Sequence, residues 1–413
     1  MKPAVAHTTI DRAESSGHAP GRQTNPASPL RSWLAVLAVA AGSFNLVTNE
    51  FLPVGLLSDI HRELNVTEGT AGAMVTAPGI IAAISAPLLP VALRRLDRRY
   101  ALLGLSLVFV LADALAAIAP NFPTMILARA ILGVGIGGFW SVAMGLGARL
   151  VSERGAQRAT AIIFGGISIG TVVGVPAGPL LGHLFGWRTA FLVVAALGLV
   201  PLVLQFILLP RLPIEKAPQV RSLGRLVKSR PARLALLATL LIVTAQFSAY
   251  TFVAPFLQRY AGASSGRVST LLLTFAIAGI VGNFVAGFAL GKRLMGTVYL
   301  IMFMLGLSAL AMPLLGQWSL GAFVVQAVWG ISYGAVPVAM QTWLFTADES
   351  ASSESGSGMF VAAYQFSIAF GSFMGGRVVD ISGVRNVMYF GGGVAVAAVI
   401  TIPLLLHRVR KAT

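Results

Sequence analysis

Three ionisable side chains interrupt long apolar stretches of the sequence. Glu50 lies in "FNLVTNEFLPVGLL" (44–57), Asp113 in the apolar run 100–119, and Arg129 in "ILARAILGVGIGG" (126–138). A charged side chain at the centre of a lipid bilayer costs about 2.5–3.5 kcal/mol on insertion scales, and such residues often mark an ion or proton path. The pattern therefore favours proton chemistry inside a membrane protein.

A carboxyl group near an arginine can act as a proton site. Desolvation raises the pKa of a carboxyl group, whereas a nearby arginine lowers it. A carboxyl group whose distance from an arginine changes between two conformations therefore changes its affinity for a proton. We predict that Glu50 binds the coupled proton, that Arg129 tunes it, and that Asp113 either takes part or is the partner of Arg129. A static ion pair is the alternative.

The elements that position these charges are predicted to be membrane-spanning helices. The chain has 413 residues, is 56% hydrophobic and 11% charged, and has a mean hydropathy of +0.82. A soluble domain carries about 25% charged residues. There is no cysteine, the five histidines form no metal-binding pattern, and no phosphate-binding loop or nucleophile elbow appears. We therefore predict no enzyme, no metal and no cofactor.

Twelve apolar segments have roughly the 20 residues that a membrane-spanning helix needs. Most are bounded by arginine, lysine, proline or glycine. The segments are 33–57, 71–93, 100–119, 123–148, 159–184, 189–209, 233–257, 268–291, 297–315, 319–345, 357–378 and 386–406. The sequence thus predicts an all-α membrane protein with twelve transmembrane helices.

The distribution of basic residues predicts the orientation of the chain. If the N-terminus is cytoplasmic, 23 of the 30 lysines and arginines fall in inside segments and six in outside loops. Because inside loops are enriched in basic residues, we expect both termini to be cytoplasmic in an inner membrane. The basic side chains behind the net charge of +16 are then expected to contact lipid headgroups and not nucleic acid. The loop 347–358 carries only acids, which count little in this rule.

The chain divides into two sets of six helices. Residues 1–30 are polar and rich in proline, serine and glycine, which predicts a disordered cytoplasmic arm. A bundle over 31–209 precedes a basic, proline-punctuated linker at 210–232. A second bundle over 233–407 precedes a cytoplasmic tail, 408–413.

An internal repeat supports this division. The stretch "RAILGVGIG" (129–137) aligns with "QAVWGISYG" (326–334) at an offset of 197, and "AGPLLGHLFGWR" (177–188) aligns with "GGRVVDISGVR" (375–385) if one residue is skipped. A duplication of this kind predicts a substrate path between the halves. In this alignment Arg129 pairs with Gln326, and Glu50 with Val253 under a similar offset. Only the first half carries charged residues inside the membrane. This asymmetry favours a functional role performed once per molecule over a structural role that both halves would need.

Several motifs resemble a known family. The stretch 126–138 resembles the helix-4 motif of the major facilitator superfamily, and "GTVVGVPAGPLLG" (170–182) resembles the helix-5 motif of its drug:proton antiporters. The loop "RRLDRRYALLG" (94–104) shares the charged core of the helix 2–3 motif but lacks its usual glycines. The resemblance covers nearly all of 31–407. Stretches such as "NEFLPVGLLSDI" and "AVPVAMQTW" are similar to purine ribonucleoside efflux pumps and their sugar-efflux relatives.

The resemblance implies two six-helix bundles and a monomeric exporter. It implies proton antiport by alternating access, with a small solute such as a purine nucleoside. A sugar or hydrophobic-drug exporter of the same fold is one alternative, and a non-transporting membrane sensor or scaffold is another. An intramembrane hydrolase is disfavoured because no nucleophile–base pair is visible.

The resemblance also implies site residues. The helix-5 and loop motifs imply gating residues, although close helix packing is the plain alternative for the glycines; these residues are Gly170, Gly174, Pro176, Gly178, Pro179, Asp97 and Arg98. Polar and aromatic residues on helices 1, 4, 7 and 10 are expected to contact the solute; they are Asn45, Thr48, Asn49, Phe139, Trp140, Gln246, Tyr250, Trp329 and Tyr333. Gln341, Trp343, Tyr364 and Gln365 are lesser candidates.

Aromatic and amide side chains together suit a planar heterocycle. The pairs Gln246–Tyr250 and Trp329–Tyr333 are each four residues apart and share a helix face. An aromatic ring can stack on a planar solute, and an amide can hydrogen-bond its edge. Simple packing of these aromatics is the alternative.

Overall fold

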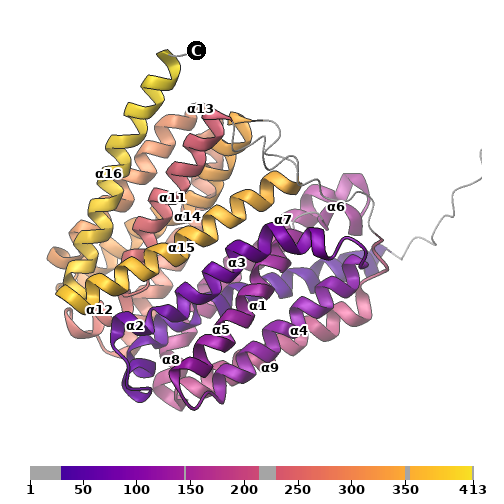
Figure 1. Cartoon of the computed structure of the whole chain (residues 1–413), viewed down its shortest axis with the longest axis horizontal. Coiled ribbons are helices and arrows are strands. Elements are labelled where there is room, and N and C mark those ends of the chain that lie inside the picture. The colour runs from indigo at the N-terminus through magenta and orange to yellow at the C-terminus, as the bar shows by residue number, and fades with distance from the viewer. Residues whose placement is uncertain (1–28, 144–145, 214–228, 349–353, 412–413) are drawn as a thin grey trace, which may run out of the picture.

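The computed structural model describes residues 29–143, 146–213, 229–348 and 354–411, and all the regular structure there is helical (Figure 1). The first half contains α1 (Pro29–Glu63), α2 (Glu68–Ala71), α3 (Ala73–Ala92), α4 (Arg98–Ala117), α5 (Phe122–Ala143), α6 (Gly147–Leu150), α7 (Glu153–Ile169), the π-helical turn η1 (Gly170–Gly174), α8 (Val175–Phe185) and α9 (Trp187–Leu208). The second half contains α11 (Arg230–Tyr250), α12 (Val253–Arg259), α13 (Ser265–Leu315), α14 (Ser319–Ala347), α15 (Glu354–Ser382) and α16 (Val384–Lys411).

The described helices account for twelve membrane spans. Ten stretches are long and apolar enough to cross a membrane. One of them, α13, has 51 residues and is broken at Arg293, where φ is −147° and ψ is 75°, so it makes two spans. The 29-residue helix α15 is also long enough to cross. The predicted twelve helices in two bundles are confirmed.

Some observed helix ends differ from the predicted segment ends, and some predicted segments lie mostly outside the described residues. The fourth predicted segment, 123–148, ends early because α5 stops at Ala143. The fifth begins at Glu153 and runs through α7, η1 and α8 to Phe185. Most of the predicted arm (1–28 of 1–30) and most of the predicted linker (214–228 of 210–232) lie outside the described residues.

The two halves repeat the same close helix contacts. A Cβ atom added at Gly133 would lie 2.5 Å from the carbonyl oxygen of Pro78, and one added at Gly330 would lie 2.2 Å from that of Phe275. Adding 197 to the numbers of Gly133 and Pro78 gives Gly330 and Phe275, the two residues of the second contact. The sequence repeat is therefore a repeat of packing: α5 on α3 in the first half, and α14 on the first span of α13 in the second.

A second pair of contacts sets the register of helices 1 and 7. A Cβ atom at Gly174 would lie 2.8 Å from Cα of Thr48, and one at Gly371 would lie 3.0 Å from Cα of Thr244. The glycines are again 197 residues apart, and the threonines are 196 apart. Helix 1 therefore corresponds to α11 at an offset of 196.

This register corrects one equivalence of the sequence alignment. Two residues beyond the threonines, Glu50 corresponds to Gln246, so its expected pairing with Val253 is wrong. Val253 begins α12, beyond the residues Thr251–Phe252 that separate α11 from α12. Gln326 remains the counterpart of Arg129. The positions of Glu50 and Arg129 are therefore occupied by amides in the second half.

Candidate functional site: a cavity between the two halves

A cavity of about 180 Å³ lies between the two halves. Helices α1, α5 and α7 line it from the first half, and α14 and α15 line it from the second. Most of its wall is apolar. The polar side chains on the wall are Glu50, Tyr333, Gln341, Tyr364 and Gln365.

Glu50 is the acid of this cavity. It lies on α1, is 6% exposed, and contributes to the cavity wall. Its Oε1 accepts a hydrogen bond from Nε2 of Gln365 on α15 over 3.0 Å. Because α1 and α15 belong to different halves, this bond links the halves at the cavity.

Arg129 is buried behind Glu50 and bonds to backbone. Its Nε donates to the carbonyl of Met74 (3.0 Å), Nη1 to that of Asn49 (3.0 Å), and Nη2 to that of Glu50 (3.2 Å). None of the ion pairs recorded for the described residues includes it. Arg129 therefore ties α5 to α1 and α3, and its charge acts on Glu50 from behind the peptide group and not through a contact with the carboxylate.

Asp113 on α4 lies inside the first bundle and is 1% exposed. Its carboxylate lies close to the side-chain amide of Asn49 on α1. It does not line the cavity, but it lies within electrostatic range of Arg129. The three predicted proton-coupling residues thus form one buried group, of which only Glu50 reaches the cavity.

Aromatic rings form two walls of the cavity. Trp140 and Phe164 stack with centroids 6.2 Å apart and planes 23° apart, and both line the space. On the other side Tyr364 donates its hydroxyl hydrogen to the hydroxyl of Tyr333 over 3.2 Å. A flat apolar face therefore lies in the same cavity as a hydrogen-bonding edge.

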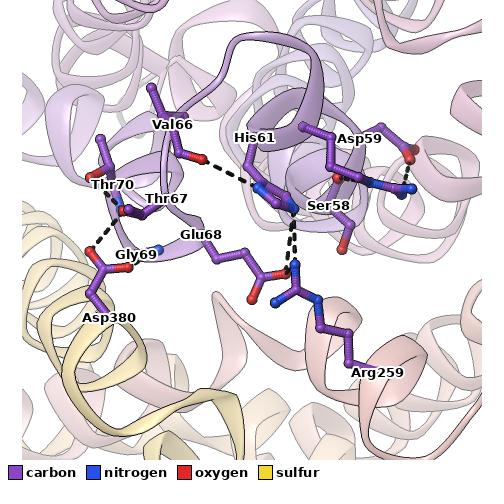
Figure 2. Close-up of polar contacts among 11 residues, drawn as sticks. Ser58, Asp59, His61, Val66, Thr67, Glu68, Gly69, Thr70, Arg259 and Asp380 are labelled. Atoms are coloured by element: carbon purple, nitrogen blue, oxygen red, sulfur yellow. Dashed lines mark hydrogen bonds and ion pairs between the residues drawn. The ribbon is translucent and has the colours of Figure 1, made fainter.

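An ion pair joins the two halves at one end of the structure (Figure 2). Arg259 of α12 lies 3.0 Å from the carboxylate of Glu68 in α2. Arg259 also lies 3.2 Å from Nε2 of His61, whose Nδ1 lies 3.3 Å from the carbonyl of Val66. With the proton on Nδ1, His61 donates to Val66 and accepts from Arg259. We call Glu68, His61 and Arg259 the basic clasp.

In a second contact at the same end, the second half supplies an acid instead of a base. Asp380 of α15 accepts hydrogen bonds from Oγ1 of Thr67 and from the backbone N–H of Gly69, both over 2.9 Å (Figure 2). We call Asp380, Thr67 and Gly69 the acidic clasp. The second half therefore contributes a cation, Arg259, and an anion, Asp380, to the closure of this end, and the first half contributes Glu68.

Glycines bring the backbones of the two halves together at the acidic clasp and near the cavity. A Cβ atom at Gly69 would lie 2.1 Å from the carbonyl oxygen of Gly376, and one at Gly79 would lie 3.0 Å from that of Gln365. Helices α3 and α15 accordingly run side by side in Figure 1. Small residues allow this close approach of two helices.

The family of the chain follows from its sequence pattern. The pattern described as Major Facilitator Superfamily matches residues 37–356, more than half of the chain. The chain belongs to the major facilitator superfamily. It is thus a multi-pass membrane protein of a transporter family, for which a small-molecule substrate is the rule.

Two relatives of this superfamily member have different names. It is 36% identical over 379 residues to "Transcription regulatory protein OpdE" of Pseudomonas aeruginosa, covering 90% of this chain and 93% of that one. It is 31% identical over 361 residues to "Purine ribonucleoside efflux pump NepI" of Escherichia coli O6:H1, covering 87% and 91%.

Solved structures share the superfamily fold. A point mutant of the nucleoside transporter NupG matches with a TM-score of 0.74 at 17% identity, covering 91% of this chain and 99% of that one. A bacterial homologue of the human lysosomal transporter Spinster, inward-facing and occupied, matches with a TM-score of 0.72 at 15% identity, covering 92% and 98%.

The helix-5 glycines of this superfamily member pack inside the first half. Cβ atoms at Gly170 and Gly174 would lie 2.7 Å from the Phe44 carbonyl and 2.4 Å from Oγ1 of Thr48. The next glycine of this face, Gly178, follows the same pattern and would meet α1 at the carbonyl of Leu52, 3.0 Å away.

The prolines of this stretch also lie against α1 or next to the π-helical turn. Pro179 lies against Gly55 of α1, its Cδ 2.3 Å from where a Cβ of Gly55 would be. Pro176 follows η1 directly. The stretch therefore meets α1 of its own half along its length, and its role as a hinge stays a prediction.

The loop motif also acts within the first half. Asp97 caps α4 by accepting from the N–H of Arg99 over 2.8 Å, and both its oxygens accept from the N–H of Leu212, at 2.9 and 3.0 Å. The N–H of Arg98 donates to the carbonyl of Leu212 over 3.0 Å. The motif thus fastens the chain after α9 to the start of α4, and its gating role stays a prediction.

Two of the predicted solute contacts, Trp140 and Tyr333, line the cavity. The others are buried within the bundles; they are Asn45, Thr48, Asn49, Phe139, Gln246, Tyr250 and Trp329. Gln246, for example, accepts a hydrogen bond from Nε1 of Trp329 over 2.6 Å.

Helix α15 contributes more of the cavity wall than the sequence predicts, since Tyr364 and Gln365 are only lesser candidates there. Phe360, Tyr364 and Ile368 repeat every four residues and all line the cavity, with Gln365 beside them. This spacing was the available signal, because residues four apart share a helix face.

Proposed function

We propose that this protein exports a small solute in exchange for protons by alternating access, with Glu50 as the proton site. The observation that carries the proposal is the place of Glu50, a buried carboxyl group on the wall of a cavity between two halves. Burial disfavours the charged form of a carboxyl group, and a nearby arginine favours it. A change in the position of α1 relative to α5 would therefore change how readily Glu50 holds a proton.

The closed end suits one stage of alternating access. The positive-inside distribution supports a cytoplasmic N-terminus in an inner membrane, which turns both clasps to the outside. In that orientation the described conformation is shut to the outside. Opening to the outside would require the basic clasp and the acidic clasp to separate while the opposite end closes.

The chemistry of the cavity favours a planar solute without negative charge. Glu50 is the acid on the wall, and no lysine or arginine lines the cavity within the described residues. The Trp140–Phe164 pair offers a stacking face, while Gln341, Gln365 and the two tyrosines offer hydrogen bonds. These features, with the name of the NepI relative, support purine nucleosides or their analogues as the solute.

The membrane potential can drive such an export. A potential of about 150 mV supplies about 3.5 kcal/mol per proton. That corresponds to between two and three decades of concentration ratio. Efflux therefore needs no ATP.

The experiment uses purified protein in liposomes with a trapped pH dye and an imposed potential. Inosine, guanosine, arabinose and a lipophilic cation are added in turn to wild type, Glu50→Gln and Asp59→Asn. We expect one solute to trigger proton movement and Glu50→Gln to abolish it while solute binding persists. Asp59 is a partly exposed acid paired with Arg62, so Asp59→Asn should behave as wild type. Solute movement without proton movement, or an unaffected Glu50→Gln, would contradict the proposal.

The solute panel also separates the alternatives within the fold. A response to arabinose alone would identify a sugar exporter, and a response to the lipophilic cation alone would identify a drug exporter.

A second candidate function is a non-transporting membrane sensor. The name of the OpdE relative, a transcription regulatory protein, favours it. A sensor binds its solute without moving it, so binding together with no flux of any solute, in wild type, would support this candidate over the exporter.

A further inference from the structure

Hydrogen bonds between the two halves occur in two places. Within the described residues, most of them belong to the clasps or lie close to them, including the bond from Oγ of Ser372 to the carbonyl of Gly72 over 3.0 Å. The bond between Gln365 and Glu50 alone lies on the cavity wall. It joins the proposed proton site to the opposite half.

We propose that the Glu50–Gln365 hydrogen bond is a latch that holds the empty, unprotonated protein in this conformation, and that either a proton or a solute releases it. The inference rests on the proposed antiport function and adds Gln365 as the positioning residue that couples Glu50 to the second half.

The charge of Glu50 sets the strength of the latch. An ionised carboxylate only accepts hydrogen bonds, and the amide nitrogen of Gln365 only donates, so the two match. A hydrogen bond with an ionised partner is roughly twice as strong as one between neutral groups. A proton on Glu50 removes that advantage and adds a donor. Oε1 of Gln365 has no partner among the described residues, so the bond from its Nε2 to Oε1 of Glu50 is the one hydrogen bond between these two side chains in this conformation.

The position of Gln365 makes the latch sensitive to movement of the halves. Its carbonyl oxygen lies 3.0 Å from where a Cβ of Gly79 would be, at the contact between α15 and α3. Its side chain then reaches from this contact to α1. Because Glu50 and Gln365 belong to different bundles, a rotation of one bundle against the other must stretch or break their 3.0 Å bond.

A latch of this kind prevents a proton leak. An exchanger that reorients when empty lets protons cross without solute, because the protonated form crosses one way and the empty form returns. The latch opposes reorientation in the empty, ionised state. A solute in the cavity contacts the wall that carries both Glu50 and Gln365 and competes for their hydrogen bonds, so it has the same effect as a proton.

The test measures proton leak in liposomes without any solute. Gln365→Leu removes the latch, and we expect its leak to rise about tenfold over wild type, as the loss of a hydrogen bond to a charged group implies. Gln365→Asn, which is too short to reach Glu50, should leak as well and provides a second variant if leucine disturbs folding. Gln317→Leu makes the same change at an exposed amide bonded to Tyr260 within the second half, and its leak should equal that of wild type.

A double variant decides whether the leak uses the proposed proton site. Glu50→Gln combined with Gln365→Leu should return the leak to the wild-type level, since no proton can load. A leak that persists in the double variant, or folded Gln365 variants that stay tightly coupled, would overturn the latch while antiport in wild type stands. Absence of solute-driven proton movement in wild type would overturn the antiport function and the latch with it.

Discussion

Gly69→Ala should open the clasped end. A Cβ atom there would lie 2.1 Å from the carbonyl oxygen of Gly376, whereas close carbon–oxygen contacts are about 3.3 Å or longer. The carbonyl belongs to helix α15 and cannot turn away, so α2 and α15 must separate by about 1 Å. That separation also stretches the bonds of Asp380 to Thr67 and Gly69. Inserting a carbon into a packed contact costs about 1–3 kcal/mol.

The same cost disappears when the clasped end opens, because α2 and α15 are then apart. Gly69→Ala should therefore shift the equilibrium toward the state in which the clasped end is open by about 5–150-fold. Gly104→Ala is the matched control, because a Cβ atom at Gly104 meets nothing within 4 Å.

The absence of cysteine makes the measurement direct. Ile118→Cys and Leu320→Cys place spin labels on the two halves at the clasped end, at positions that are 70% and 76% exposed. Distances between the labels, measured by electron paramagnetic resonance in liposomes, should gain a longer population in Gly69→Ala. An unchanged distribution, or an equal change in Gly104→Ala, would refute the reasoning.

Three further substitutions test other contacts. Asp97→Ala removes the cap of α4 and both acceptors of the Leu212 N–H, so thermal unfolding should show a loss of about 1–2 kcal/mol; an unchanged melting temperature would contradict the fastening role. Arg129→Lys should lower the melting temperature, because an ammonium group cannot reach three carbonyls on two helices; equal stability would show that these bonds contribute little. Arg259→Gln leaves Glu68 without its ion pair, so the label distances should lengthen as in Gly69→Ala, and unchanged distances would show that the basic clasp does not hold this end.

The fold was predictable because its signals are long and repeated. Apolar runs of about 20 residues and the bias of basic residues gave twelve spans in two bundles. The repeat at an offset of 197 was visible where a glycine pattern anchored it, from Gly133 and Gly137 to Gly330 and Gly334. It was lost between helices 1 and 7, because α1 and α11 share few distinctive residues and their register depends on contacts such as that of Gly174 with Thr48.

The cavity was only partly predictable because a membrane helix can be apolar on every face. In a soluble helix the polar stripe indicates the exposed side. In α1 the polar residues Asn45, Thr48 and Asn49 face the interior of their own bundle, and Glu50 reaches the cavity beside the apolar Val47 and Phe51. Residue type alone could not separate these two directions. The resemblance placed the expected solute contacts on helices 1, 4, 7 and 10, so it gave little reason to expect cavity residues on α15.

The duplicated scaffold gives the strongest argument that the membrane charges serve transport. The position of Glu50 is Gln246 in the second half, and the position of Arg129 is Gln326. Gln326 is fully buried, and neither of its side-chain polar atoms has a hydrogen-bond partner among the described residues. The second half therefore makes the same close helix contacts without a charge at either position, so these charges are not required to build a bundle of this kind. Burying a charge costs free energy, so charges that only one half carries are expected to serve a function that only this half performs. A single proton site on the cavity wall would be such a function.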